Sequence, residues 1–405
     1  MSIEVLKYGG SSLAGEGRIA AVAKQVADLH RKGVSLVVVV SAVGHTTKNL
    51  IETANGFACR LNRREIDQLI STGEQQSMAL LTMALGKRDV PARSFAGWQA
   101  GIRAGGVFTD GRISSVDPRM VARSLEKGEV AVVAGFQGVT DEGDVITLGR
   151  GGSDLSAVAL AAALEADCCR IFTDVEGMFS ADPRLVPKAF RLERISSGEC
   201  MEMAAAGARV LQARSVELAW RYEVPLFVGS SFEKGRGTWI MRDDVSEGFV
   251  VRSITHDTEV AKVAVLGVPD IPGIAARVFS SLSEAGVGAE MIIQSIMRGQ
   301  VNDIAFLVRK EFLGEAIDVC RKTARDIEAQ GVAFDTEVGK ISLVGAGLSN
   351  HPDAPARMFS VLAGESVNID MISSTSMSIT CVVSSADVKK AVVALHKAFI
   401  EEAQR

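Results

Sequence analysis

The feature that most constrains the fold of this chain is an internal repeat in its C-terminal part. When residues 270–295 are shifted by 80 positions, onto residues 350–375, nine of twenty-six residues are identical. The identical pairs are Pro272/Pro352, Ala276/Ala356, Arg277/Arg357, Phe279/Phe359, Ser280/Ser360, Leu282/Leu362, Val287/Val367, Met291/Met371 and Ile292/Ile372. In each copy a strand, a turn, a helix and a second strand precede a further helix, which predicts two small ferredoxin-like βαββαβ domains. Two unrelated α+β stretches are the alternative, and so dense a gap-free match argues against them.

The first 240 residues show another pattern, in which short apolar runs alternate with helical spacing. The expected strands are residues 3–8, 34–40, 130–134, 169–173 and 224–228, and the expected helices include residues 19–29 and 155–164. Nearly continuous β-branched runs are typical of parallel strands that are buried on both faces. The pattern predicts an α/β domain with a mostly parallel sheet sandwiched by helices. Pro225 either argues against the last strand or places it at an edge, because proline cannot donate to a neighbouring strand.

Composition limits the partners and the compartment that the sequence suggests. The 405 residues carry a formal net charge of -5 with no basic block, which argues against nucleic acid or an anionic membrane as a partner. The first residues lack the apolar stretch of a signal peptide, and no apolar run is long enough to span a bilayer. Six cysteines without CxxC spacing are expected to be reduced. We therefore expect a cytoplasmic protein with no protein-bound metal centre.

Two glycine loops are the strongest candidates for chemistry. Lys7-Tyr8-Gly9-Gly10-Ser11-Ser12 follows the first expected strand, at the sheet edge where open α/β proteins bind ligands. Gly149-Arg150-Gly151-Gly152-Ser153-Asp154 opens an alanine-rich helix whose N-terminus favours an anion. Each loop has a simpler interpretation, as a tight turn or as a turn with helix capping. Capping alone does not require three glycines around an arginine, so the second loop favours phosphate or carboxylate binding.

These segments together resemble the aspartokinases, a branch of the amino acid kinase family that carries paired C-terminal ACT domains. Neither a Walker A motif nor the protein-kinase motifs are present, so a nucleotide would be bound by another device. The segments that carry the resemblance are Lys7 to Ser12, Ser41-Ala42-Val43-Gly44 with Thr46-Thr47, Thr72-Gly73-Glu74, Gly135-Phe136-Gln137-Gly138, Gly149 to Asp154, Thr173-Asp174 and Ala181-Asp182-Pro183-Arg184. The resemblance implies an amino acid kinase domain over residues 1–245, a first ACT-like domain over 246–335 and a second over 336–405.

The resemblance also implies a reaction and a set of site residues. The reaction is transfer of the γ-phosphoryl group of ATP, with Mg²⁺, to the side-chain carboxylate of L-aspartate, on the way to lysine, threonine and methionine. Lys7 and Asp154 are the implied catalytic residues. The implied ATP-binding residues are Lys7, Tyr8, Gly9, Gly10, Ser41, Thr173, Asp174, Phe179, Ser180, Asp182, Arg184 and Arg209. The implied aspartate-binding residues are Thr47, Glu74, Arg150, Gly151, Gly152 and Ser153.

The ACT-like part implies feedback regulation by lysine, threonine or both. The effector-binding residues carried over are Asp270, Ile271 and Gln294 in the first repeat and Asn368 and Ile369 in the second. A homo-oligomer through the ACT domains is expected, with a shorter subunit from an internal start near Met241 as a further hypothesis. The alternative is that these segments are only loops and sheet edges of a dimerisation unit. The Asp-Ile-Pro-Gly of the first copy is Asn-His-Pro-Asp in the second, so two identical effector sites are not required.

Some residues depart from the family pattern and keep two rival functions open. Arg209 stands where lysine is usual, and His45 and Lys48 lie where acidic residues are common. One rival is a kinase for another carboxylate, such as glutamate or N-acetylglutamate. The other is an inert amino-acid sensor on a kinase scaffold, against which Lys7, Arg150 and Asp154 argue.

Overall fold

The computed structural model describes residues 2–57, 62–208, 210–232, 235–242, 251–295, 301–348 and 351–403, which divide into two compact units. The first unit comprises Met1–Met178, Arg191–Ala204 and Arg209–Ser246, and the second comprises Phe179–Phe190, Ala205–Ala208 and Glu247–Arg405. Two short segments from the first 245 residues therefore belong to the second unit. The predicted domain boundaries place both segments in the kinase domain and stay a prediction.

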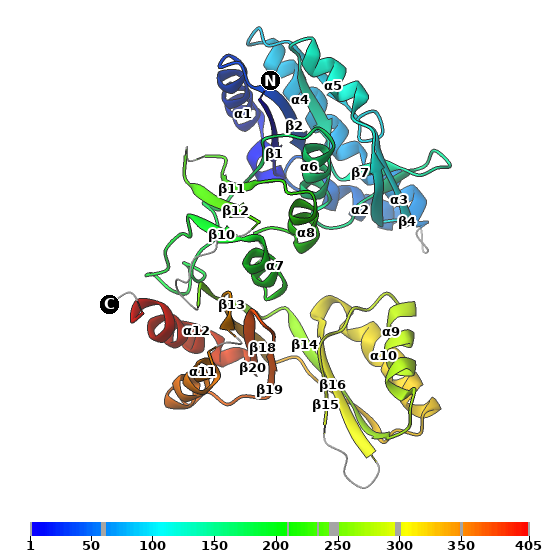
Figure 1. The fold of residues 1–405 in the computed structure, drawn as a ribbon. Coiled ribbons are helices and arrows are strands. Elements are labelled where there is room, and N and C mark those ends of the chain that lie inside the picture. Colours follow the sequence, from blue (N-terminus) through cyan, green and yellow to red (C-terminus); the bar gives the residue numbers. More distant parts are fainter. Residues whose placement is uncertain are drawn as a thin grey trace. The chain divides into compact units, whose positions relative to one another are not determined.

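The first unit is built on an eight-stranded sheet (Figure 1). Its strands, in sheet order, are β10 (Arg194–Ser196), β12 (Gly237–Met241), β11 (Leu226–Ser230), β9 (Cys168–Thr173), β1 (Ile3–Tyr8), β2 (Ser35–Val40), β6 (Val130–Ala134) and β3 (Ala92–Phe95). Every neighbouring pair is parallel except β11 and β12. The predicted, mostly parallel α/β sheet is confirmed.

Helices surround this sheet and a smaller, four-stranded sheet completes the unit. The helices are α1 (Glu16–His30), α2 (Thr46–Phe57), α3 (Arg63–Ile70), α4 (Thr72–Gly86), α5 (Arg119–Glu126), α6 (Gly152–Ala163), α7 (Ser197–Ala205) and α8 (Ala213–Arg221). The smaller sheet has the order β5 (Asp110–Val116), β4 (Ile102–Val107), β7 (Gln137–Val139) and β8 (Val145–Thr147). Across the described residues, no helix combines the length and the apolar character needed to cross a membrane.

The central strands are apolar on both faces because helices cover both. Leu6 and Tyr8 of β1 pack in one core with residues of α1 and α4. Lys7 lies between them in the strand and points to the opposite face, where it meets α6. This alternation follows from the two-residue period of a strand. Lys7 is therefore a polar side chain on the α6 face of the sheet, near the end of β1.

The prediction of an edge position for the strand after Pro225 is wrong. β11 starts at Leu226, directly after the proline, and lies between β9 and β12. Pro225 has no N–H to donate, but its carbonyl oxygen accepts a hydrogen bond from the N–H of Cys169 at 2.9 Å. Because the missing N–H falls just outside the ladder, the proline does not prevent pairing on both sides.

The second unit contains two four-stranded antiparallel sheets, each covered by two helices. The first sheet has the order β15 (Glu290–Gln294), β16 (Val301–Arg309), β14 (Val260–Pro269) and β17 (Gly331–Asp335), with helices α9 (Ile274–Glu284) and α10 (Leu313–Asp326). The second has the order β13 (Ser253–Asp257), β18 (Val338–Val344), β20 (Ser378–Ser384) and β19 (Met371–Ser374), with helices α11 (Asp353–Gly364) and α12 (Val388–His396). The repeat predicted from the sequence is thus a repeat of structure.

The strand β13 differs from the expected division between the two repeats. It lies within residues 246–335, yet it pairs with β18 in the second sheet, in antiparallel register from Ser253↔Val344 to Asp257↔Lys340. The buried pattern of β13 completes the apolar face of that sheet. The first repeat is therefore inserted between two strands of the second.

Candidate active site

The candidate site is formed where the loops after β1 and β2 run side by side. The N–H of Gly44 donates to Gly10 O at 3.1 Å, and the N–H of Ser41 donates to Tyr8 O at 3.1 Å. A Cβ on Gly10 would lie 2.5 Å from Ala42 O, closer than carbon and oxygen approach. Glycine is required there because no side chain fits between the loops.

An ion pair joins the two glycine loops that the sequence singled out. Lys7 Nζ lies 2.6 Å from Asp154 Oδ1, and both side chains are 11% exposed. Asp154 stands in the first turn of α6, after Gly151 with a left-handed φ of 69°. A Cβ on Gly9 would be only 3.7 Å from Lys7 Nζ, so the glycine leaves room beside the ammonium group. A buried cation next to a helix N-terminus is suited to a phosphate.

The N-terminal turn of α6 packs closely against the end of β6. A Cβ on Gly135, which follows β6, would lie 2.9 Å from the Cβ of Ser153. Gly152 and Ser153 are buried, whereas Arg150 is exposed at the start of the turn. The predicted aspartate-binding residues of this loop are therefore neighbours of Asp154, with the arginine on the solvent side.

Glu74 carries the clearest sign of a missing partner. Its side chain is 3% exposed, and Oε1 accepts the N–H of Ala42 at 2.9 Å. Oε2 is buried and has no hydrogen-bond partner among the described residues. Burial raises the pKa of Glu74 to about 7, although the Ala42 N–H opposes the shift. A buried, half-satisfied carboxylate is suited to a cation or a hydrogen-bond donor supplied by a ligand.

Thr46 and Thr47 begin α2 close to this carboxylate. A Cβ on Gly73 would lie 2.8 Å from the Cβ of Ala42 and 3.4 Å from Cγ2 of Thr46. Thr46 itself donates to Val43 O at 2.7 Å, and Thr47 is half-buried. Thr47 and Glu74 stay predicted aspartate-binding residues. Ala42 was not among them, because it meets Glu74 through a backbone N–H that no side-chain motif reports.

Two of the predicted ATP-binding residues, Tyr8 and Gly9, make contacts within the protein. Tyr8 is fully buried, stacks on Phe172 with ring centroids 5.0 Å apart, and donates to Gln25. The N–H of Gly9 donates to Phe172 O at 3.1 Å, so it is already used. The Tyr8 side chain and the Gly9 N–H thus have partners within the protein, and the assignment of both residues to ATP binding stays a prediction.

Four further predicted ATP-binding residues lie in the segment Phe179–Phe190 of the second unit. Ser180 is fully buried, its Oγ lies 3.0 Å from His396 Nε2, and it accepts the N–H of Phe190 at 3.1 Å. The hydroxyl of Ser180 is thus occupied by contacts within the second unit, and the assignment of Ser180 to ATP binding stays a prediction. Arg184 donates to both carboxylate oxygens of Asp182, which lowers the pKa of Asp182.

The remaining ATP-binding predictions are placed as follows. Thr173 ends β9, which lies next to β1, and Asp174 follows it; Thr173 Oγ1 donates to Asp174 Oδ1 at 3.0 Å. Ser41 follows β2 and is half-buried. Phe179 accepts the hydroxyl of Ser253 through its carbonyl oxygen at 3.0 Å. Arg209 lies outside the described residues.

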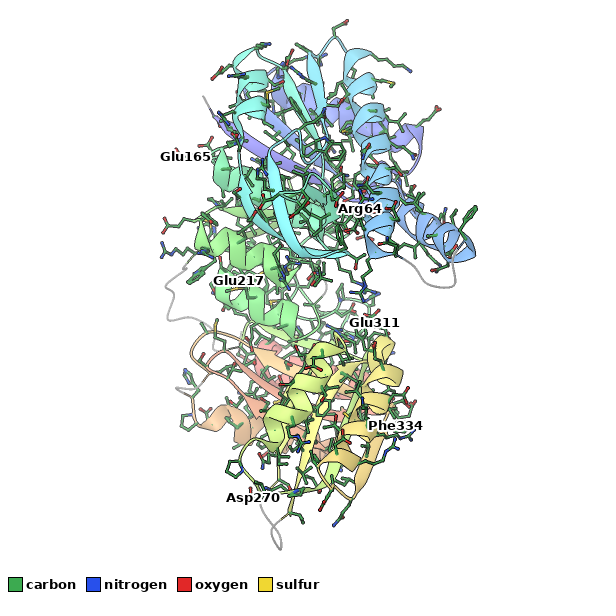
Figure 2. The ribbon with its side chains drawn as sticks, turned by 90° about the vertical axis from the view of Figure 1, so that its right-hand side faces the viewer. Arg64, Glu165, Glu217, Asp270, Glu311 and Phe334 are labelled. Atoms are coloured by element: carbon green, nitrogen blue, oxygen red, sulfur yellow. The ribbon has the colours of Figure 1, made fainter. Side chains whose placement is uncertain are left out.

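In the second unit, the predicted effector residues of the first repeat gather at one end of its sheet. Asp270 (Figure 2) follows β14 and accepts Asn302 Nδ2 at 3.1 Å. Gln294 ends β15 and pairs with Ile304, two residues beyond Asn302 along β16. Ile271 is 61% exposed in the loop. Asn302, the second residue of β16, was not among the predicted residues.

The predicted effector residues of the second repeat, Asn368 and Ile369, lie in the turn before β19. Asn368 is exposed, and Ile369 packs against the core of the second repeat. The side chain of Ile369 therefore has a structural role, and a ligand could meet this turn through its backbone or through Asn368.

Comparison with known proteins shows which families this chain is similar to. The amino acid kinase family matches residues 2–230, and the ACT domain family matches residues 263–323 and 341–399. An aspartokinase of Pseudomonas aeruginosa is 43% identical over 402 residues and covers 98% of each chain. An aspartokinase of Thermus thermophilus is 42% identical over 401 residues, covering 98% of this chain and 99% of its own.

A solved structure agrees with these sequence matches. Escherichia coli aspartokinase III in complex with aspartate and ADP superposes with a TM-score of 0.83, at 25% identity, over 98% of this chain and 99% of that chain. An aspartate kinase from Synechocystis is 40% identical with a TM-score of 0.55, over 98% of this chain and 69% of that one. The chain belongs to the amino acid kinase family and, within it, to the aspartokinases.

Proposed function

We propose that this chain transfers the γ-phosphoryl group of ATP to the side-chain carboxylate of L-aspartate, giving 4-phospho-L-aspartate. The observation that carries the proposal is the buried Lys7–Asp154 ion pair between two glycine loops. Its relatives are aspartokinases along nearly their full length, and a solved one binds aspartate and ADP. This reaction is the entry to the synthesis of lysine, threonine and methionine.

The reaction needs charge neutralisation and alignment more than it needs a base. An aspartate side chain, with a pKa near 4, is already ionised at neutral pH, so the nucleophile requires no deprotonation. The barrier comes from bringing this anion to a polyphosphate. Lys7 is the group that stabilises the transferring phosphoryl, and Asp154 holds the ammonium group in place from the start of α6. Asp154 accepts no proton in this scheme.

The pocket for L-aspartate, the phosphoryl acceptor, is assigned from the charges of the residues around it. Glu74 supplies the unpaired Oε2 to the α-ammonium group of aspartate, and Arg150 pairs with a carboxylate of the same molecule. Thr47, Gly151, Gly152 and Ser153 complete the pocket. The half-satisfied carboxylate supports this assignment, because binding an ammonium group removes the cost of leaving Oε2 without a partner.

Magnesium is expected to arrive with the nucleotide. The described residues hold no group of three or more His, Cys, Asp or Glu that could bind a metal. At the sheet edge, Asp154 is engaged by Lys7 and Asp174 by Thr173. Because both carboxylates already have partners, we expect Mg²⁺ to be held mainly by phosphate oxygens and water. The ion would neutralise phosphate charge, with Ser41, Thr173, Asp174, Phe179, Arg184 and Arg209 as the proposed contacts of the nucleotide.

The regulatory part of the proposal is feedback by lysine, threonine or both through the ACT domains. Asp270, Gln294 and Asn368 are the proposed effector contacts. The proposed assembly is a homo-oligomer through the ACT domains, with a shorter subunit that starts near Met241 as an additional component. A cytoplasmic location is part of the same proposal.

An acyl phosphate assay tests the activity. Hydroxylamine converts the acyl phosphate to a hydroxamate, so purified chain is incubated with ATP, Mg²⁺ and hydroxylamine plus aspartate, glutamate or N-acetylglutamate in parallel. We expect hydroxamate with aspartate. Product with glutamate or N-acetylglutamate alone would contradict the proposed substrate, and no product with any acceptor would favour the inert sensor.

A further inference from the structure

The chain on either side of Arg150 is held by the start of α8. Before Arg150, the carbonyl oxygen of Leu148 accepts a hydrogen bond from Arg214 Nη1 at 3.1 Å. After it, a Cβ on Gly151 would collide with Cγ of Gln212 and lie 2.8 Å from its Cβ. Gln212 directly precedes α8, and Arg214 is the second residue of that helix. Arg150, a proposed contact of the substrate carboxylate, is exposed between these two points.

Arg214 also joins this segment to the turn between β4 and β5. Its Nη1 donates to Asp110 Oδ1 at 3.1 Å, and its Nη2 donates to the carbonyl oxygen of Gly111 at 3.0 Å. Gly149 has a left-handed φ of 74°, and a Cβ there would lie 2.7 Å from the same oxygen of Asp110. The guanidinium group thus bridges the turn and the carbonyl that precedes Gly149. A planar fork of donors is suited to such a bridge, because it binds several acceptors in one fixed geometry.

A buried carboxylate ties the same turn to the end of β8. Asp67 of α3 is fully buried, and its Oδ2 accepts the N–H of Thr109 and the N–H of Thr147, both at 2.9 Å. Its Oδ1 accepts the hydroxyl of Thr147, the last residue of β8, at 2.6 Å. Thr109 has a left-handed φ of 76°, which is strained for a β-branched residue. Such strain persists only where the surrounding contacts impose it, so the turn has a defined place beside β8.

We infer that Arg214 is a positioning residue for aspartate binding, because it fixes the path of the chain from β8 into Arg150. Asp67 determines where β8 ends, and Arg214 determines how Leu148 and Gly149 leave it. Without the guanidinium fork, the side chain of Arg150 has no fixed starting point. This inference rests on the proposed function, which places Arg150 against a carboxylate of aspartate. In this role Arg214 acts through Arg150 and does not contact the substrate.

Asp154, which lies further along the same loop, is anchored separately. It stands in the first turn of α6, where its N–H donates to the carbonyl oxygen of Gly151 at 3.0 Å. Its carboxylate pairs with Lys7 at 2.6 Å. Neither contact involves Arg214. Loss of Arg214 should therefore weaken the binding of aspartate and spare the phosphoryl-transfer step.

The test compares Arg214→Met with Arg112→Met in the full chain, by initial rates of hydroxamate formation at varied aspartate and varied ATP. Arg112 is a matched control, since it pairs with the same Asp110 at 3.4 Å and no described contact joins it to Leu148. We expect Arg214→Met to raise the KM for aspartate about tenfold, because a misplaced guanidinium loses most of a charge-assisted contact. The kcat and the KM for ATP should change less than about threefold, as expected when only substrate binding is lost. Arg112→Met should leave all three constants unchanged.

A double-mutant cycle shows whether Arg214 acts through Arg150. Arg150→Met should raise the KM for aspartate at least as much as Arg214→Met does. Adding Arg214→Met to Arg150→Met should then cause no further rise, whereas a merely structural role predicts that the two losses multiply. Arg214→Lys is a second variant with a smaller disturbance of folding. Its ammonium group keeps the charge but not the fork, so its KM for aspartate should lie between those of the wild type and Arg214→Met.

Three results would overturn the inference while the wild type stays active. The first is an unchanged KM for aspartate in both Arg214 variants, with circular dichroism showing a folded chain. The second is a pair of losses that multiply in the Arg150→Met/Arg214→Met enzyme. The third is a wild-type KM for aspartate in Arg150→Met, since Arg214 would then have nothing to position. A wild type without aspartate kinase activity would refute the proposed function instead.

Discussion

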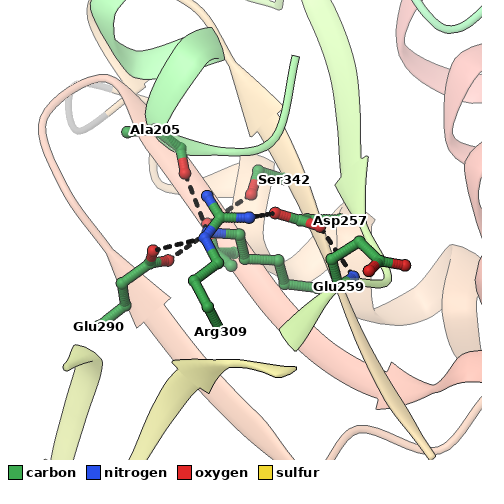
Figure 3. Close-up of polar contacts among 8 residues, drawn as sticks. Ala205, Asp257, Glu259, Glu290, Arg309 and Ser342 are labelled. Atoms are coloured by element: carbon green, nitrogen blue, oxygen red, sulfur yellow. Dashed lines mark hydrogen bonds and ion pairs between the residues drawn. The ribbon is translucent and has the colours of Figure 1, made fainter. Parts of the chain in front are cut away.

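The described residues contain two buried lysines, Lys7 and Lys340, in ion pairs of nearly equal length and in unlike surroundings. Lys7 lies 2.6 Å from Asp154, beside glycine loops and a helix N-terminus, at the edge where Glu74 keeps an unpartnered oxygen. Lys340 lies 2.5 Å from Glu290 and also donates to a helix carbonyl (Figure 3). The comparison teaches that ion-pair geometry alone does not distinguish the proposed catalytic lysine from a structural one. The two pairs differ in their surroundings, since Lys7 lies beside glycine loops and near the buried Glu74 oxygen that has no partner among the described residues.

The largest effect should come from Lys7→Met. Without the ammonium group the charge on the transferring phosphoryl is uncompensated, and we expect kcat to fall about a hundred- to a thousandfold. Initial rates of aspartyl hydroxamate formation measure it. Lys262→Met removes the same charge from the second unit, where Lys262 pairs with Asp370, and should keep wild-type turnover. A Lys7→Met enzyme that is still active would remove the contrast between the two lysines.

Asp154→Asn should have a smaller effect on the same step. The carboxylate orients Lys7 and does not react, so we expect kcat to fall by about a hundredfold or less, from misplacement of the ammonium group. Because the two residues act as a unit, the double variant Lys7→Met/Asp154→Asn should be no worse than Lys7→Met. Additive losses would show that Asp154 has a separate function.

Glu74→Gln should separate activity from stability. Loss of the carboxylate removes a charged partner of the substrate ammonium, so the KM for aspartate should rise about tenfold. For the same reason, the wild-type KM for aspartate should rise as the pH falls below about 7, where Glu74 takes up a proton.

Glu74→Gln should stabilise the substrate-free chain, although it weakens the binding of aspartate. Folding raises the pKa of Glu74 from 4.5 to about 7, so the folded state binds this proton more tightly than the unfolded chain. The stabilisation from that proton is complete below pH 4.5 and is lost as the pH rises through 7. Glu74→Gln should therefore stabilise the free chain by about 2 kcal/mol more at pH 8 than at pH 5. Thermal unfolding of the wild type and the variant at both pH values measures this difference. The same stabilisation at pH 5 and pH 8 would contradict the burial of an unpaired carboxylate at position 74.

The smallest effect should come from Lys262→Met. Its ion pair with Asp370 is partly exposed and screened, so removing it should lower the free energy of unfolding by less than about 1 kcal/mol. Chemical denaturation measures this value. A loss as large as that of Lys340→Met would mean that the two pairs between the repeats are equivalent.

The sequence predicted the features that depend on local patterns. Apolar runs located β1, β2, β6 and β9, and a strand end followed by glycines located Lys7 and Gly10 at the carboxyl end of β1. Features that depend on distant partners were missed. Ser180 reads as part of a polar turn, yet its hydroxyl is buried against His396, 216 residues away. Likewise, nothing in the alternating pattern of β13 says which of two similar sheets it joins.

The insertion of one repeat into the other bears on the order of events during synthesis. β13 leaves the ribosome before the whole first repeat, and its partner β18 only afterwards. The strands of the first repeat follow one another without interruption, whereas β13 has no partner until β18 has been made. A shorter polypeptide that starts at Met241 would still carry β13. One that starts after Asp257 would expose the apolar edge of β18 to pairing with other chains, as unprotected edges do.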